Sequence, residues 1–137
     1  MSQFLTPVQQ AVYTRLAAQI SSATVYDDVP DMTEGLPAAD FPYIVIGNDT
    51  EVAWDTDDTL GGNCTITLHA FSQYQGKKEA KEIMAAIDVA LHRQAANLSA
   101  TGFRFVECLR EYSEVFDEDD GATRHGVCRY RITIEKE

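Results

Sequence analysis

Histidine is the side chain in this sequence best suited to acid–base or metal chemistry, but the spacing of the histidines supports neither. The three histidines are His69, His92 and His125. None belongs to an HExxH or HxH pattern, and none has a partner at the spacing of metal ligands. We expect His69 to be packed or edge-exposed in a strand. We place His125 in a loop, as a surface or interface group. The histidines therefore predict neither a catalytic residue nor a metal site.

Two acidic clusters have the composition of a calcium site but not its spacing. An EF-hand loop needs a glycine at its sixth position and a glutamate at its twelfth. Counted from Asp117, the glycine comes fifth and the twelfth residue is Cys128. Counted from Asp55, the sixth residue is Leu60. We interpret both clusters as solvated carboxylates in loops.

Other patterns that would indicate an enzyme are missing from the sequence. Gly61-Gly62 belongs to neither a GxxxxGK nor a GxGxxG pattern, so it does not predict a phosphate-binding loop. No serine lies in a GxSxG elbow. Composition alone does not exclude paired carboxylates for glycoside hydrolysis, but the acids cluster in loops and only Trp54 could be a cleft aromatic. We predict no enzyme and no cofactor.

The cysteines and the N-terminus bear on where the chain is made. Cys64, Cys108 and Cys128 show no zinc spacing, and the alternation around Cys64 and Cys128 predicts buried thiols in strands. An odd count and an N-terminus without signal-peptide features argue against a disulfide framework. No apolar stretch approaches the roughly 20 residues of a membrane helix. We expect a protein made in the cytosol, without a membrane partner.

Negative charge is concentrated in one part of the 137-residue chain. The net charge is −11, and residues 27–58 contain ten acidic side chains and no Lys or Arg. Such a surface repels nucleic-acid phosphates, which disfavours ordinary DNA binding. Two interpretations stay open: the acids serve solubility, or they form a wall past which DNA slides without sticking.

The order of predicted elements indicates a single α+β domain. Apolar residues at helical spacing predict amphipathic helices over 7–20, opened by Thr6-Pro7, and over 77–92. We predict strands over 24–26, 43–46, 51–54 and 64–71, and extended chain over 98–116 with a bend or bulge near Glu107. A final strand follows at 127–135. The expected fold is a mostly antiparallel, twisted sheet packed with two helices.

The strict alternation of the final strand assigns its side chains to two faces. One face carries Cys128, Tyr130, Ile132 and Ile134, and the other carries Arg129, Arg131, Thr133 and Glu135. The three predicted loops, 27–42, 55–62 and 117–126, are long and charged, which suits contacts with other subunits. We interpret Trp54 as either core or interface anchor, with core favoured.

Ten charged residues are our candidates for subunit interfaces or for the lining of a channel. They are Asp55, Asp57, Asp58, Asp117, Asp119, Asp120, Arg124, His125, Arg129 and Arg131. We hypothesise that Arg124, Arg129 and Arg131 pair with acidic loops of a neighbouring copy, because segregated charge favours ring contacts between different surfaces.

Four stretches, in this order, carry a family resemblance. They are Val25-Tyr26-Asp27-Asp28-Val29-Pro30, Phe41-Pro42-Tyr43-Ile44-Val45-Ile46-Gly47, Thr65-Ile66-Thr67-Leu68-His69-Ala70-Phe71-Ser72 followed by Gly76, and Gly121-Ala122-Thr123-Arg124-His125-Gly126-Val127. With the helices between them, nearly the whole chain resembles the tail-terminator (tail completion) family of long-tailed phages and gene transfer agents. Segments 31–40 and 117–120 fit this family least well.

The resemblance implies a structural protein of the virion tail, assembled in the bacterial host cytoplasm. Six copies would form a ring on the last ring of tail tube protein, stop tube polymerisation and meet the head-side connector or stopper protein. Double-stranded DNA would pass through the ring without specific binding. Two alternatives remain: another connector ring, such as a stopper or adaptor, and an acidic protein that mimics DNA or inhibits an enzyme.

Overall fold

The computed structural model describes residues 3–26 and 41–137 of the chain. The elements, in order, are α1 (Leu5–Gln19), β1 (Thr24–Tyr26), β2 (Tyr43–Ala53), β3 (Gly61–Ser72), α2 (Lys78–Leu91), a 3-10 turn η2 (Ala95–Asn97), β4 (Phe103–Asp117) and β5 (Arg124–Lys136). The strands form one sheet in the order β1-β2-β3-β5-β4. Only the β1–β2 pair is parallel. The predicted α+β fold is confirmed. The predicted loop over 27–42 falls mostly outside the described residues.

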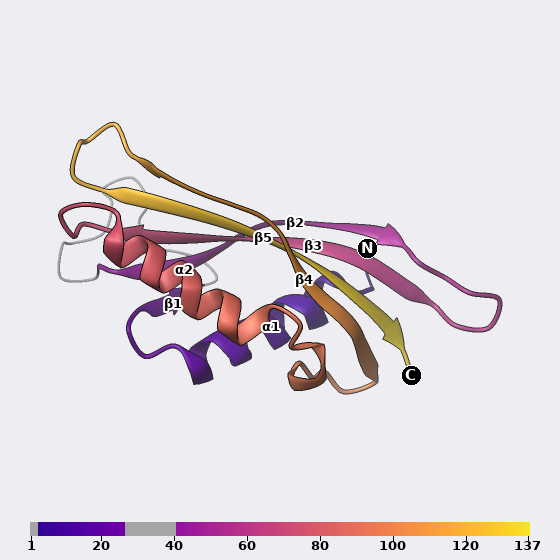
Figure 1. Ribbon diagram of the computed structural model, residues 1–137. Helices are drawn as coiled ribbons and strands as arrows, with labels where there is room; N and C mark the ends of the chain where they lie inside the picture. Colours follow the sequence, from indigo (N-terminus) through magenta and orange to yellow (C-terminus); the bar gives the residue numbers. More distant parts are fainter. Residues whose placement is uncertain (1–2, 27–40) are drawn as a thin grey trace.

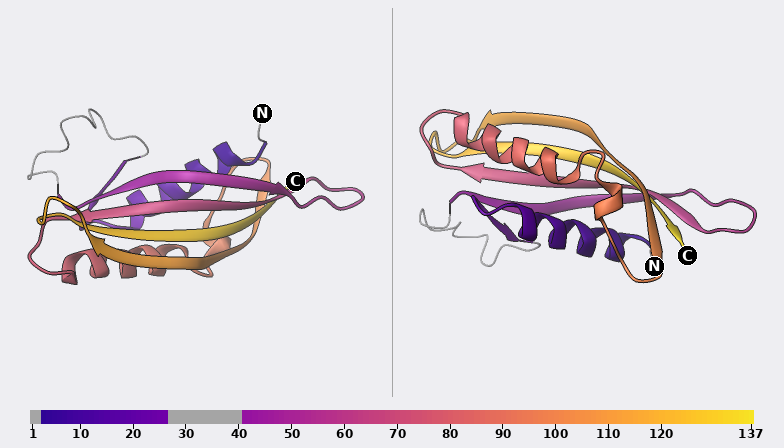
Figure 2. Two further views of the ribbon diagram at one scale, coloured as in Figure 1. Left: turned by 90° about the horizontal axis from the view of Figure 1, so that it is seen from above. Right: turned by 60° about the horizontal axis from the view of Figure 1, so that its bottom comes forward.

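The sheet has one face covered by helices and one face that no described element covers. Both helices pack beneath the sheet in Figure 1, and the view from above in Figure 2 looks onto the uncovered face. Burial along β3 alternates accordingly: Ile66 and Leu68 face the helices and are fully buried, whereas Thr65 and Thr67 face the other way and are half-buried. We call the second surface the open face.

The helices cover the sheet through the apolar stripes that the sequence predicts. In α1 the buried residues are Val8, Ala11, Val12 and Leu16, and in α2 they are Ala80, Ile83, Ile87, Ala90 and Leu91. The Arg15 Nε donates to the backbone oxygen of Ala90 at 2.9 Å and ties the helices together. The prediction that Thr6-Pro7 opens this helix, with Thr6 as its N-cap, is wrong, because α1 already begins at Leu5. Instead, the Phe4 amide donates to the Glu51 carboxylate at 3.0 Å.

Strand boundaries differ from the prediction where pairing with a distant strand extends an element. The strands predicted at 43–46 and 51–54 are one strand, β2, with a register shift between Ile46 and Asp49. β5 begins at Arg124 rather than 127, because its first residues pair with both β3 and β4. His125 therefore lies in a strand, and the prediction that it lies in a loop is wrong.

The bend predicted in the 98–116 segment is confirmed, although the strand itself begins only at Phe103. The pairing of β4 with β5 shifts register between Phe105 and Glu107, and shifts again between Arg110 and Tyr112. Each shift adds a residue to one strand and increases the local twist. The twist turns the later half of β4 alongside α2 (Figure 2).

The buried side chains of the strands include three thiols and one tyrosine hydroxyl, and the hydroxyl has polar partners. All three cysteines are buried, as predicted for Cys64 and Cys128, and burial raises the pKa of each thiol to about 12. The buried Tyr130 hydroxyl donates to Asp88 of α2 at 2.8 Å, and Asp88 also pairs with Arg110 at 3.0 Å. No helix in the described residues is long and apolar enough to cross a membrane.

Truncating two neighbouring side chains on β3 should lower the free energy of unfolding by very different amounts. We expect Ile66→Ala to lower the free energy of unfolding by about 2–5 kcal/mol, because it opens a cavity under the helices. Thr67→Ala, on the open face, should change it by less than about 0.5–1 kcal/mol. Urea denaturation of both variants measures the difference. Equal losses would contradict the one-sided core.

Candidate assembly surfaces

The sequence-predicted residues lie in three separate places. Asp55, Asp57 and Asp58 belong to the turn joining β2 and β3, residues 54–60, which we call the hairpin tip. Asp117, Asp119, Asp120 and Arg124 lie in or beside the turn joining β4 and β5, residues 118–123, which we call the acidic turn. His125, Arg129 and Arg131 follow along β5.

The hairpin tip and the acidic turn lie at opposite ends of the sheet. Gly61 pairs with Glu135 at one end of β3, and Ser72 pairs with Arg124 at the other. At about 3.3 Å per residue, β3 alone separates the two turns by roughly 40 Å. Figure 1 shows the hairpin tip projecting beyond the other elements. The structure therefore does not bring the two acidic clusters together within one copy.

Local hydrogen bonds order the hairpin tip. The Asp55 carboxylate accepts from the Gly61 amide at 2.9 Å, and the Thr56 amide donates to the Thr59 backbone oxygen at 2.8 Å. The Asp58 carboxylate accepts from the hydroxyls of Thr56 and Thr59 at 3.2 and 3.3 Å. All these donors are neutral groups, so neither carboxylate has a basic partner among the described residues.

Apolar side chains lie beside these carboxylates. Val52, Trp54 and Leu60 are 65%, 41% and 48% exposed. The preference for Trp54 as a core residue is wrong. Val52 pairs with Asn63 on the open face, and Trp54, two residues further along, lies on the same face with its ring against Gly61. Exposed apolar groups gathered at a projecting turn are typical of a binding surface.

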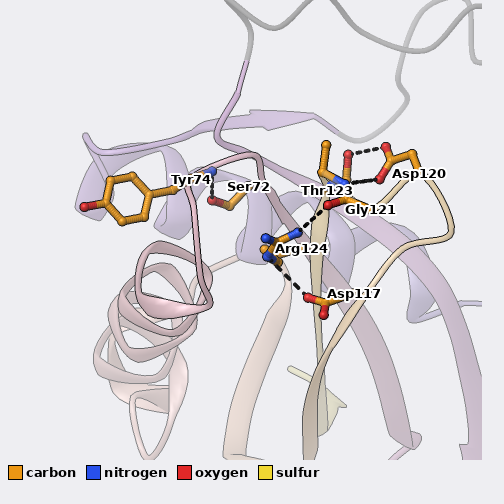
Figure 3. Close-up of polar contacts among 8 residues, drawn as sticks. Ser72, Tyr74, Asp117, Asp120, Gly121, Thr123 and Arg124 are labelled. Atoms are coloured by element: carbon orange, nitrogen blue, oxygen red, sulfur yellow. Dashed lines mark hydrogen bonds and ion pairs between the residues drawn. The ribbon is translucent and has the colours of Figure 1, made fainter.

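The acidic turn is closed by its own side chains (Figure 3). Asp120 accepts from the amides of Ala122 and Thr123, each at 2.8 Å, and from the Thr123 hydroxyl at 2.7 Å. The hydroxyl bond and then the two amide bonds lower the pKa of Asp120. Arg124 pairs with Asp117 at 3.3 Å and donates to the Gly121 backbone oxygen. The carboxylates of Asp117 and Asp120 thus already have hydrogen-bond or ion-pair partners within the same copy.

Arg129 and Arg131 share one carboxylate on the open face. The Nε atoms of the two residues lie 3.1 and 2.8 Å from the Glu111 carboxylate, and Arg129 also lies over the Tyr112 ring. Both arginine side chains are nearly half exposed. Two guanidinium groups on one carboxylate leave positive charge for a neighbour, so pairing with another copy stays a prediction.

A histidine cluster that sequence reasoning missed lies at the acidic-turn end of the open face. His125 Nδ1 lies 2.5 Å from the Glu118 carboxylate, and His125 Nε2 lies 2.7 Å from His69 Nδ1. Phe71 stacks on His125 with ring centroids 4.3 Å apart. Gly47 leaves room for His69, because a Cβ there would lie 2.6 Å from its Nε2. Only the register of β3 against β5 reveals this cluster.

Comparison with known proteins identifies the family. The family model of tail completion protein gp17 matches residues 10–135. The chain belongs to the tail completion protein gp17 family. A curated relative, tail completion protein gp17 of Bacillus phage SPP1, is 31% identical over 94 residues, which cover 69% of this chain and 68% of the relative. The resemblance read from the sequence is confirmed.

Two solved structures share the fold of this tail completion protein. A chain from the virion of a native gene transfer agent particle is 22% identical, with a TM-score of 0.80, covering 98% of this chain and 99% of that one. The SPP1 gp17 structure is 23% identical, with a TM-score of 0.57, covering 93% and 88%. The chain is a structural tail completion protein of the gp17 family, and both solved structures share its fold.

The histidine cluster makes the stability of this tail completion protein sensitive to acid. Burial first, and then the nearby His125, lower the pKa of His69 below its unfolded value of about 6.5. The folded state therefore binds fewer protons, and this part of the stability is present above about pH 6.5 and declines as the pH falls below it. His69→Phe should reduce the loss of unfolding free energy between pH 7.5 and pH 5. Urea denaturation of the unaltered protein and of the His69→Phe variant between pH 7.5 and pH 5 tests this prediction. Equal losses of unfolding free energy in the two proteins would contradict it.

Proposed function

We propose that six copies of this protein form a ring that caps the tail tube. The ring prevents further addition of tail tube protein and joins the tail to the head-side connector or stopper protein. The observation that carries the proposal is the one-sided sheet: an open face with charged groups and a hairpin tip with exposed apolar groups. A domain of this size with such surfaces is suited to burial against neighbours.

The comparisons support this proposal. The family is named for tail completion, and the matching gene transfer agent chain belongs to a whole particle. That match covers nearly all of both chains, so the fold of this chain is represented almost in full by a chain of that particle. In the proposed setting the protein is made in the bacterial host cytoplasm and becomes part of the virion tail.

The charge of the chain is compatible with DNA passage through such a ring. Its net charge is −11. Carboxylates facing the opening would repel DNA phosphates over about 8–10 Å at physiological salt, so DNA would slide without adhering. We propose the acids of the hairpin tip and of the acidic turn as candidates for this lining. Because these two turns lie at opposite ends, they would line different levels of the channel or different surfaces of the ring.

Deletion of the gene distinguishes this function from the alternatives. We expect particles made without the protein to have overlong tails of variable length that lack heads, because nothing ends tube growth. Electron microscopy of negatively stained particles gives tail length and head attachment. Supplying the unaltered gene in trans is the control and should restore both.

Two other outcomes would contradict a terminator. Headless tails of normal length would place the protein among other connector rings, such as a stopper or adaptor, which act after tube length is set. Intact infectious particles would show that the protein is not needed in the virion, and would favour an acidic DNA mimic or inhibitor.

A further inference from the structure

The hairpin tip combines an apolar anchor with negative charge that has no partner. Trp54 is exposed beside Val52 and Leu60. The Asp57 carboxylate has no hydrogen-bond or ion-pair partner within the described part of the chain. Tryptophan is among the residues that contribute most to binding when a partner surrounds them. The tip therefore fits a partner surface that is apolar at its centre and positively charged at its rim.

A largely apolar groove with a lysine among its lining residues lies between α2 and β4. It consists of two hollows of about 330 and 320 Å³ that share Met84 and Ser113. Ala85 and Val89 of α2 line one hollow and Val115 of β4 lines the other. Each hollow is near the lower end of the roughly 300–1,000 Å³ of ligand pockets, so it suits a large side chain rather than a domain. We call this surface the α2–β4 groove.

The α2–β4 groove carries two acids and two bases, and one of the bases, Lys81, has no ion-pair partner among the described residues. Its acid Asp88 already pairs with Arg110 and accepts the Tyr130 hydroxyl, and its acid Glu114 accepts the Tyr112 hydroxyl. Lys81 lines the groove, is exposed, and has no ion-pair partner among the described residues. Lys81 thus offers the hairpin tip one positive charge beside the apolar side chains of the groove.

The two surfaces cannot meet within one copy. The groove lies along the half of the sheet near the acidic turn, because Ser113 and Val115 of β4 pair with Cys128 and Gly126 of β5. The hairpin tip projects from the opposite end (Figure 1). A contact between them joins two different surfaces of two copies. Contacts of this head-to-tail kind form a closed ring when the rotation between copies closes.

We propose that the hairpin tip of one copy docks into the α2–β4 groove of the next, with Trp54 in the groove and Asp57 facing Lys81. The proposal deepens the proposed function, and rests on it for the closure of six such contacts into a ring. It assigns the partner of the tip as a second copy of this chain rather than tail tube protein or the connector.

Charge exchange tests the pair in assembled tails. Asp57→Lys and Lys81→Glu should each weaken association between copies roughly tenfold, and the double variant should recover most of it. Trp54→Ala should weaken association by at least as much, while its half-exposed position leaves the melting temperature of the monomer nearly unchanged. Thr14→Lys, which adds a lysine at an exposed position of α1 outside both surfaces, is the control and should have little effect.

Engineered cysteines give a direct readout of the same contact. The three native thiols are buried with pKa values of about 12, so they do not compete in mild oxidation. The Asp57→Cys/Lys81→Cys protein should form disulfide-linked chains of copies in purified tails, and each single variant should not. Asp57→Cys paired with Thr14→Cys, an exposed position on α1, is the control and should not cross-link.

The outcomes separate this proposal from the proposed function. Tails of normal length without cross-linked copies would overturn the tip–groove contact while leaving the terminator intact. A cross-link from the thiol introduced by Asp57→Cys to another virion protein would also overturn it. Cross-linked copies in the purified protein, together with normal tail length when the gene is deleted, would support the contact and reject the terminator.

Discussion

Burial of only one face of the sheet is the constraint on which the rest of this structure depends. Along β3 and β5, apolar and polar residues alternate with the period of a strand, so two helices suffice to cover the apolar side. Ile66, Leu68, Tyr130 and Ile132 are fully buried there. The opposite face is left with threonines, arginines and histidines, which tolerate water and also offer hydrogen bonds and charge to a neighbour.

The same constraint locates the assembly surfaces. Val52 pairs with Asn63 on the open face and Trp54 follows two residues later, so both lie opposite the helices and remain exposed. At the other end, Asp120 and Arg124 close the acidic turn, and Glu118 anchors the histidine pair. These charged side chains at the acidic turn thus have partners within one copy, whereas Asp57 of the hairpin tip remains available to a neighbouring copy.

Local patterns in the sequence predicted the helices, the faces of β5 and the bulge near Glu107, because each depends on residues close in the chain. The prediction for Trp54 failed because exposure at that position depends on the register of β2 against β3, which places its side chain on the open face. The pairing of His69 with His125 was missed because it joins residues 56 apart and exists only in the register of β3 against β5. Family membership came from four short stretches in order, which no physical pattern alone would have supplied.

Electron cryomicroscopy of the head–tail junction tests the central claim most directly. The account predicts density for six copies of this fold in a ring between the last ring of tail tube protein and the head-side connector. Each hairpin tip should reach the neighbouring copy. Density for the fold elsewhere in the particle, or a ring in which the open face and the hairpin tip both remain free in solvent, would contradict it.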